Sequence, residues 1–180
     1  IVNYNVKDFL IQCIDSIHQS DSCRKTEIIV VDNHSFDGSQ KILKKRFPHI
    51  KLIENQENIG FGSAVNQGAE LASGEYLFVL NPDTIIQEDT INVLVNYLIA
   101  HKEVGMVGPK IINSDGKLQQ ACKRSFPTFK VALPKLLGIS KLFPNSTWAG
   151  KYNLTYLDPD KIHSVDAVSG ACMLMRTNLF

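Results

Sequence analysis

The chain has 180 residues, of which 44% are hydrophobic and 21% charged, and its formal net charge at pH 7 is +1. This length is that of one ordinary domain, and the composition excludes wholesale disorder. A net charge this small gives no reason to expect a nucleic-acid partner, and we expect none. No apolar run approaches the roughly 20 residues that a membrane-spanning helix needs.

The cysteines indicate the redox compartment of the protein, and the two ends of the sequence indicate whether it is part of a longer protein. Cys13, Cys23, Cys122 and Cys172 are scattered without C-x-x-C spacing. This argues against structural zinc and a disulfide scaffold, and suits a reducing, cytoplasmic compartment. Cys172 lies in an apolar run and is expected to be a buried small hydrophobe. Both ends look cut, because residues 1–5 read as the last half of a strand without an initiator Met or signal sequence. We therefore expect part of a longer protein.

Strand-like and helix-like segments alternate through the first half. We expect strands over 1–4, 27–31, 50–54 and 76–80, and helices over 10–17, 39–47, 64–72 and 91–99. Residues 28–31 are four β-branched residues in a row, as in a strand that is covered on both faces. The order predicts an α/β fold with a mostly parallel sheet and helices on both faces.

The pattern loosens after Val104. Strands are expected over 104–112 and 115–119, joined by a turn at 113–116, and again over 165–175. Residues 126–160 hold four prolines and a weak helix near 133–137. A long, poorly patterned stretch inside a domain is usually functional or mobile.

Two acidic residues follow buried strands, with a glycine-rich loop between them. Asp32 ends the second strand, Asp83 lies just past the fourth, and the loop spans 58–62. Ligands of open α/β sheets bind outside the carboxyl ends of the strands. Strand termination or capping explains either acid alone about as well, but the combination favours a site for a nucleotide diphosphate and its metal.

The segment Asn81-Pro82-Asp83 is the metal candidate. Magnesium and manganese take oxygen ligands, typically one or two carboxylates with phosphates and water. Asp83 offers a carboxylate and Asn81 a neutral carbonyl oxygen, so the diphosphate has to supply the remaining ligands.

Other polar residues have ordinary structural explanations. Asp37 or Ser39 is expected to cap the helix that follows, and capping is favoured over catalysis for Asp37. A solvated helix face accounts best for the cluster Lys41, Lys44, Lys45 and Arg46. The glycine loop lacks the G-x-G-x-x-G pattern, so an ordinary loop and a functional one are equally supported. No pairing of a nucleophile with a base is evident.

Five ordered segments resemble those of the inverting family 2 glycosyltransferases, which have the GT-A fold, and most closely the bacterial rhamnosyltransferase-like branch that builds cell-surface polysaccharides. They are Ile1-Val2-Asn3-Tyr4-Asn5, Val31-Asp32-Asn33-x-Ser35-x-Asp37-Gly38-Ser39, Asn58-x-Gly60-Phe61-Gly62-x-Ala64-x-Asn66-x-Gly68, Leu80-Asn81-Pro82-Asp83 and Val168-Ser169-Gly170-Ala171-Cys172-Met173-Leu174. The resemblance covers essentially the whole chain.

The resemblance implies a donor half over 1–103 and an incomplete acceptor half over 104–180, within one GT-A domain. The implied nucleotide-sugar-binding residues are Asn3, Tyr4, Asn5, Asp32, Asn66, Asn81 and Asp83. Asp83 corresponds to the last acid of the family's D-x-D element and would bind Mg²⁺ or Mn²⁺ together with the diphosphate. Asn81 replaces the first acid of that element.

The resemblance implies that Arg124, Gly170 and Ala171 lie on the acceptor side of the site. For Arg124, a surface arginine without a role in the site is an equally supported alternative. The family's general base is an Asp in a Glu-Asp element, which is expected beyond Phe180. Asp166 precedes the Gly-Ala strand and is not assigned as that base.

The implied reaction is transfer of a sugar, with inversion, from a nucleotide-diphosphate sugar to a glycan or lipid-linked acceptor. The implied location is the cytoplasm or the inner face of the cell membrane, with any peripheral membrane association through regions outside this sequence. Two alternatives remain: a non-catalytic nucleotide-sugar-binding module, which a missing Glu-Asp element would favour, and a nucleotidyltransferase. The latter needs a basic, glycine-rich N-terminal loop, which residues 3–8 do not offer.

Overall fold

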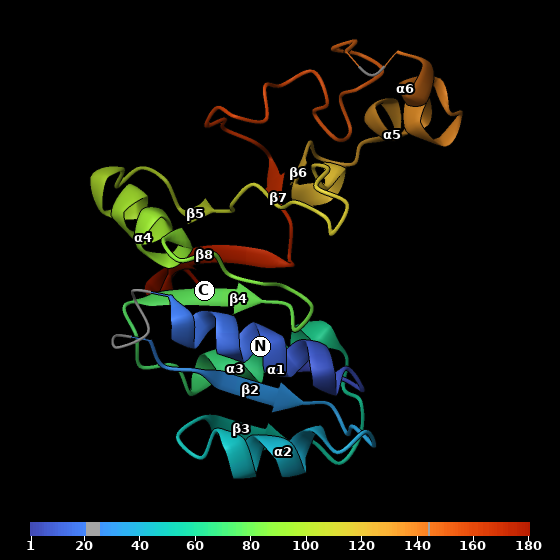
Figure 1. Cartoon of the computed structure of the whole chain (residues 1–180). Helices are drawn as coiled ribbons and strands as arrows, with labels where there is room; N and C mark the ends of the chain where they lie inside the picture. Colours follow the sequence, from blue (N-terminus) through green and yellow to red (C-terminus); the bar gives the residue numbers. More distant parts are fainter. Residues whose placement is uncertain (21–25, 144) are drawn as a thin grey trace. The chain divides into compact units, whose positions relative to one another are not determined.

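A computed structural model describes residues 1–20, 26–143 and 145–180, so Cys23 lies outside the described residues. The chain forms two compact units (Figure 1). The first unit comprises residues 1–107 and 170–180, and the second comprises 108–169. The expected division into donor and acceptor halves at residue 103 stays a prediction.

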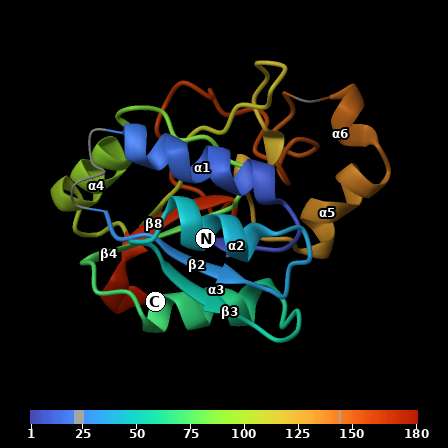
Figure 2. The ribbon, with the colours of Figure 1, turned by 60° about the horizontal axis from the view of Figure 1, so that its bottom comes forward.

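The first unit contains the parallel sheet that the sequence predicts. Strands β1 (Val2–Asn3), β2 (Ile29–Asp32) and β3 (Lys51–Glu54) pair in parallel in the order β1-β2-β3. Helices α1 (Lys7–Gln19) and α2 (Ser39–Arg46) cover one face, and α3 (Phe61–Glu70) covers the other (Figure 2). The α/β fold class is therefore confirmed.

Side chains of β2 alternate between these two faces. Val30 packs with Leu10 and Ile14 of α1 and Leu43 of α2 in one buried cluster. On the opposite face, Gly68 of α3 lies so close that a Cβ added there would meet Val31 Cγ2 at 3.3 Å. Because both faces are covered, β2 can be apolar without alternation, as its sequence predicts.

The second sheet of this unit corrects the expected parallel order. Strand β4 (Tyr76–Leu80) pairs antiparallel with β8 (Cys172–Arg176), which also pairs antiparallel with β5 (Met106–Val107). Helix α4 (Thr90–Ala100) packs Leu94 and Leu98 against Leu174 of β8. The last strand of the chain thus lies beside β4, a long-range pairing that local sequence pattern does not reveal.

The second unit has little regular structure. Strands β6 (Lys123–Arg124) and β7 (Ala167–Val168) pair antiparallel, and helices α5 (Phe129–Leu136) and α6 (Ile139–Leu142) lie between them in the sequence. Short 3₁₀ helices among the described residues span Gln120–Cys122 in this unit and Thr177–Leu179 in the first.

The three strands expected after residue 103 are much shorter than predicted. The hairpin expected over 104–119 keeps its turn, in which Asn113 N donates to Lys117 O at 2.8 Å, but its arms reduce to β5 and one bridge between Ile112 and Leu118. Ile112 is half exposed, so no buried face stabilises a longer ladder. The strand expected over 165–175 is divided into β7 and β8 by residues 169–171.

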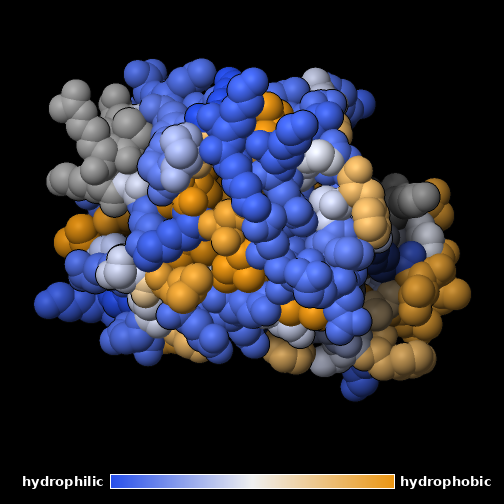
Figure 3. All heavy atoms as spheres, turned by 90° about the horizontal axis from the view of Figure 1, so that it is seen from below, coloured by the Kyte–Doolittle hydropathy of each residue, from blue (hydrophilic) through white to orange (hydrophobic). Residues whose placement is uncertain are grey.

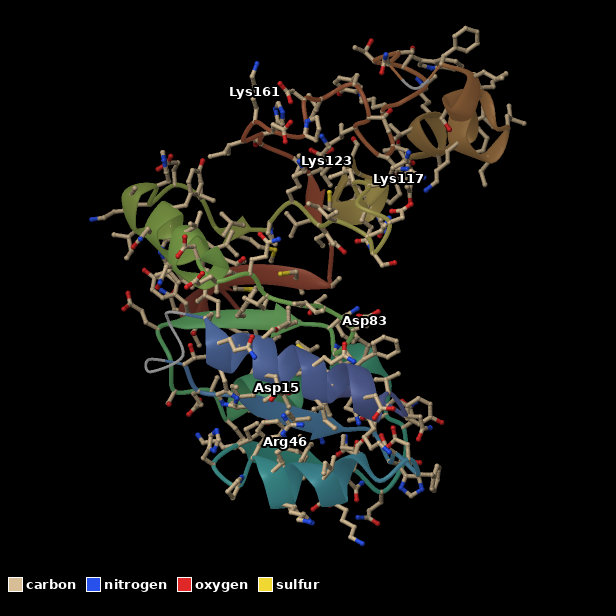
Figure 4. The ribbon with its side chains drawn as sticks, in the orientation of Figure 1. Asp15, Arg46, Asp83, Lys117, Lys123 and Lys161 are labelled. Atoms are coloured by element: carbon tan, nitrogen blue, oxygen red, sulfur yellow. The ribbon has the colours of Figure 1, made fainter. Side chains whose placement is uncertain are left out.

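Two smaller predictions are confirmed. Cys172 is buried, and burial raises the pKa of its thiol to about 12. The basic cluster of α2 is a solvated face, on which Lys44 pairs with Glu54 at 2.7 Å and Arg46 with Asp15 at 2.8 Å (Figure 4). Figure 3 shows that the face carrying α2 is largely hydrophilic.

Among the described residues, no helix combines the length and apolar character that crossing a bilayer demands.

Candidate active site

A hydrogen-bonded polar cluster lies at the carboxyl ends of β1 and β2. Asn3 Nδ2 donates to Asp32 Oδ2 at 2.6 Å and to Ser35 Oγ at 3.1 Å. Ser35 Oγ also accepts the backbone N–H of Asn5 at 3.0 Å. Register explains the grouping, because Asn3 and Asp32 are direct partners in the parallel ladder. Three of the predicted donor-site residues are therefore brought together.

Asp32 is fully buried and accepts hydrogen bonds at both carboxylate oxygens. Besides Asn3, the backbone N–H of Ser35 donates to Oδ1 at 2.9 Å and Gln40 Nε2 donates to it at 2.7 Å. A carboxylate has about four lone-pair positions, so one acceptor position remains. Asp32 thus organises the loop after β2 and keeps capacity for one donor.

Asn3 carries an unsatisfied acceptor. Its side chain is fully buried, and Oδ1 has no hydrogen-bond partner among the described residues. A buried acceptor left without a partner costs about 1–3 kcal/mol. A ligand N–H or hydroxyl would satisfy it, and this atom lies on a side chain that also contacts Asp32.

The loop between β2 and α2 corrects the expected cap. The N-cap of α2 is Gly38, with φ +83°, and Ser39 is the first helical residue. Asp37 still holds this helix start, because its Oδ1 accepts Ser39 N at 3.0 Å, while its Oδ2 accepts Lys7 N at 2.7 Å. Gly38 takes the cap position because the backbone there adopts the left-handed conformation that favours glycine.

The electrostatics of Asp37 fit a structural role. Burial raises the pKa of the Asp37 carboxyl, but the hydrogen bonds from Ser39 and Lys7 outweigh burial and hold this pKa below its ordinary value. Asp37 therefore stays ionised as an acceptor that joins the starts of α1 and α2, although the N-cap position of α2 is Gly38.

The turn after β4 presents Asp83 to solvent, while the residues around it are fixed. Asn81 N donates to Ala171 O at 2.9 Å, Thr84 Oγ1 donates to Asn81 O at 2.6 Å, and Cys13 Sγ of α1 lies 3.6 Å from the same oxygen. Asp83 itself is exposed, at the end of β4 (Figure 4). A rigid turn thus carries an available carboxylate.

The glycine loop connects these two parts of the first unit. Asn33 Nδ2, next to Asp32, donates to Gly60 O at 3.3 Å. Gly60 has φ +84°, a conformation that requires glycine, and α3 begins at the next residue. A Cβ added at Gly170 would meet Phe61 Cε1 at 4.0 Å, and Gly170 adjoins Ala171. Contacts therefore run from Asp32 through the loop to the Gly-Ala segment and Asn81.

The remaining predicted residues are exposed. Tyr4 is 46% exposed, and Asn5 has φ +54° with its Oδ1 accepting Phe36 N at 2.8 Å. Asn66 lies exposed on α3, and no hydrogen bond between described residues ties it to the cluster. The geometry leaves Tyr4 and Asn66 available to a ligand without assigning them a role.

In the second unit, Arg124 is exposed on β6, opposite Ala167 of β7. Asp166 accepts Phe126 N at 2.9 Å and Ser125 Oγ at 2.8 Å, and these hydrogen bonds hold the pKa of its carboxyl below the ordinary value. Asp166 thus fixes a turn, in agreement with its exclusion as the general base.

Sequence reasoning did not assign roles to Ser35, Gln40 and Phe61. Ser35 bridges Asn3 and Asn5, Gln40 contacts Asp32, and Phe61 packs toward Gly170. The sequence does contain a signal for the position of Ser35. An Asp at the end of a strand commonly accepts a hydrogen bond from a backbone N–H two or three residues later, and Ser35 is three residues after Asp32. The contacts of Gln40 and Phe61 depend on tertiary packing.

The residues around Asp83 fit a metal that is held mainly by its substrate. The described residues contain no group of three or more His, Cys, Asp or Glu side chains placed to hold an ion. One exposed carboxylate beside an asparagine suits a hard cation that keeps water and phosphate ligands, as Mg²⁺ does. Asp83 would supply the protein carboxylate of such a site.

Comparison with known proteins decides the family. The model of "Glycosyl transferase family 2" matches residues 1–180. The chain belongs to glycosyl transferase family 2. The resemblance drawn from the five segments is confirmed.

Curated relatives of this family 2 chain are bacterial sugar transferases. An N-acetylglucosaminyl-diphospho-decaprenol L-rhamnosyltransferase of Mycobacterium tuberculosis is 27% identical over 168 residues, covering 87% of this chain and 54% of that protein. A poly(ribitol-phosphate) beta-glucosyltransferase of Bacillus spizizenii is 30% identical over 152 residues, covering 79% and 24%. The chain thus spans about half the length of the first of these relatives and about a quarter of the second.

Solved structures agree on the GT-A fold. A mannosyltransferase of Pyrobaculum calidifontis, in complex with GDP-Man and Mn²⁺, superposes with a TM-score of 0.56 at 27% identity, covering 62% of this chain and 34% of that one. Staphylococcus aureus TarS superposes with a TM-score of 0.61 at 18% identity, covering 98% and 45%, and supports the fold alone.

Proposed function

We propose that this chain is the donor-binding part of a glycosyltransferase that moves a sugar from a nucleotide diphosphate to a glycan or lipid-linked acceptor in bacterial envelope polysaccharide synthesis. The observation that carries the proposal is the buried Asn3–Asp32 pair with its unsatisfied Asn3 Oδ1, at the carboxyl ends of parallel strands. Ligands of open α/β sheets bind at this edge.

The nucleoside part of the donor binds at the Asn3–Asp32 cluster. A base N–H or ribose hydroxyl donates to Asn3 Oδ1 or to the remaining acceptor position of Asp32. Tyr4 and Asn5 follow β1 directly and are exposed, so they contact the same moiety. Uptake of a donor at this site removes the cost of the buried unsatisfied oxygen.

The diphosphate binds at Asp83 through Mg²⁺ or Mn²⁺, with Asn81 beside it. The metal offsets the negative charge that grows on the leaving diphosphate. The Mn²⁺ and GDP-Man complex of the P. calidifontis relative supports this assignment. On the acceptor side, Ala171 accepts a hydrogen bond from Asn81 N and Gly170 precedes it, while Arg124 remains a candidate in the second unit.

Isothermal titration of UDP-, dTDP- and GDP-sugars, with and without Mn²⁺, tests the proposal. We expect one donor class to bind, and Asp83→Ala to weaken binding at least about tenfold with Mn²⁺, because about 1.4 kcal/mol of metal-mediated contact is lost. Without Mn²⁺ the variant should bind as the wild type does. Asp83 is exposed, so this change leaves folding intact.

Glu88→Ala is the matched control, since Glu88 is also an exposed acid a few residues further along the chain. It should not alter the affinity. Equal affinities of wild type and Asp83→Ala in the presence of Mn²⁺ would remove Asp83 from the site, and failure of all three donor classes to bind would refute the proposed function.

A further inference from the structure

The second unit carries a strongly basic segment inside a nearly neutral chain. Between Asp115 and Asp158 there is no acidic residue and no histidine, but there are seven basic residues. They are Lys117, Lys123, Arg124, Lys130, Lys135, Lys141 and Lys151. Since the whole chain has a net charge of +1, the remainder is net negative. This segment is therefore a local positive region that the overall charge conceals.

The same segment exposes large apolar side chains. Seven lie within residues 126–148, and each is between 57% and 77% exposed. They are Phe126, Phe129, Leu136, Leu137, Leu142, Phe143 and Trp148, and we call them the 126–148 surface. Figure 3 shows hydrophobic atoms gathered on the right of the view, the side on which α5 and α6 of the second unit are drawn in Figure 2. Clustered exposed apolar groups, unlike scattered ones, mark interaction sites.

Helix α5 directs its apolar stripe outward. Phe129, Leu133 and Leu136 recur at the spacing of one helix face, and Phe129 and Leu136 are among the most exposed apolar residues of this unit. Val131 and Pro134, on the other side, are buried and attach the helix to its own unit. The exposed stripe is therefore not required for the internal packing of α5.

Lysines flank this stripe with their charged ends available. Lys130 and Lys151 are exposed, while Lys135 Nζ lies 3.9 Å from the ring centroid of Tyr152. Phenylalanine, tryptophan and leucine beside lysine form the composition of segments that lie in a membrane interface. Anionic headgroups attract such lysines by about 1 kcal/mol for each lysine near the surface.

We propose that the 126–148 surface docks this protein on an anionic phospholipid bilayer, with the apolar side chains of α5 and α6 inserted at the headgroup level and the lysines on the lipid phosphates. The sequence led us to expect membrane association only through regions outside it. This proposal instead assigns the membrane contact to residues of the chain itself. The proposal does not depend on sugar transfer, and its test contains no nucleotide sugar.

Trp148 is the single tryptophan of the chain and belongs to this surface, so it reports insertion directly. The full chain is titrated with vesicles of phosphatidylcholine alone and with vesicles containing about one-third phosphatidylglycerol. We expect a blue shift of Trp148 emission and co-sedimentation with the anionic vesicles, both reduced by high salt because the ionic attraction is screened.

Two pairs of variants separate insertion from general charge effects. Leu136→Asp with Leu142→Asp should abolish the blue shift, whereas Val93→Asp with Ile99→Asp, at apolar positions of α4 that are also exposed, should keep it. Lys130→Gln with Lys151→Gln should weaken vesicle binding about thirtyfold. Lys41→Gln with Lys45→Gln, on the exposed face of α2, should change it less than about threefold.

Three results would overturn the proposal. One is equal or absent binding to both kinds of vesicle. Another is a concentration-dependent blue shift without vesicles that the Leu136 and Leu142 changes abolish, which would make the surface a contact between two copies. The third is a melting temperature lowered by those changes, with vesicle binding retained, which would make the surface part of the internal packing.

Discussion

Asp37 joins the starts of two helices through one carboxylate, with Ser39 N and Lys7 N as donors. Asp37→Asn removes the charge that makes both bonds strong, so we expect the free energy of unfolding at pH 7 to fall by about 1–2 kcal/mol. Urea unfolding measures this loss, and Glu57→Gln, at an exposed loop position, serves as the control.

The effect of Asp37 should depend on pH with a definite sign. Its pKa is lower in the folded chain than its ordinary value, so its stabilisation is full above the unfolded pKa of about 3.9 and is lost as the pH falls through the folded pKa. The difference between wild type and Asp37→Asn should therefore shrink below about pH 4. A difference that stays constant from pH 7 to pH 3 would contradict this account.

Individual residues of the site were predictable where chemistry and strand position coincide. Asp32 ends one apolar run and Asp83 lies just past another, and both lie at the carboxyl end of a strand as that pattern indicates. The unsatisfied Asn3 Oδ1 was not predictable. It results from the way the Asn3 amide is oriented, with its nitrogen donating to Asp32 and Ser35 and its oxygen left without a partner. The cap at Gly38 was missed because a left-handed backbone conformation competes with the side-chain preference of Asp37 and Ser39.

At the scale of elements, glycine substitutions in α3 test how closely this helix approaches the sheet. Gly68→Val places methyl groups against Val31, where even a Cβ would lie at 3.3 Å, so we expect a loss of about 1–3 kcal/mol in unfolding free energy. Gly62→Ala, in the same helix, meets nothing within 4 Å and should be neutral or stabilise by up to about 1 kcal/mol.

Thermal and urea unfolding of both variants checks this prediction. A Gly68→Val variant as stable as the wild type would show that α3 is not seated on Val31. Reduced donor affinity of a stable Gly62→Ala variant would instead favour the functional interpretation of the loop, which the sequence left open.

Helices and buried strands of the first unit were predictable because each has a strong local period. Ile91, Leu94 and Leu98 of α4 are buried as expected, whereas Ile99, at the end of the same predicted apolar stripe, is exposed. Strand β4 has the predicted bounds. The antiparallel position of β8 beside β4 was not predictable, since it is set by contacts almost a hundred residues apart. The hairpin after Val104 is shorter than predicted because residues 112–117 around its turn are exposed, and an exposed ladder lacks the packing that fixes its register.

At the scale of the whole molecule, the distribution of charge matters more than its sum. A net charge of +1 gave no reason to expect a polyanionic partner, yet residues 116–157 contain seven basic residues and no acid. The second unit also has the weakest sequence pattern, and its short elements are explained by tertiary contacts such as those of Asp166.

The general base of the proposed transfer is assigned to none of the described residues. The family resemblance implies a general base in a Glu-Asp element that follows the Gly-Ala strand, so we expect the 180-residue chain to bind the donor without transferring its sugar. A longer form that carries this element should transfer the sugar with inversion at the anomeric carbon, as followed by NMR of the product. Transfer by the 180-residue chain itself would place the base among the residues described above.

The central claim is that a nucleotide sugar binds at the carboxyl ends of β1, β2 and β4, and hydrogen exchange measured by mass spectrometry tests it most directly. With the donor and Mn²⁺ added, we predict slower exchange in peptides covering residues 1–6, 32–39 and 81–84, and unchanged exchange in α4 and in α5. Protection confined to α4 or to the second unit, under conditions in which calorimetry shows the donor bound, would contradict the claim.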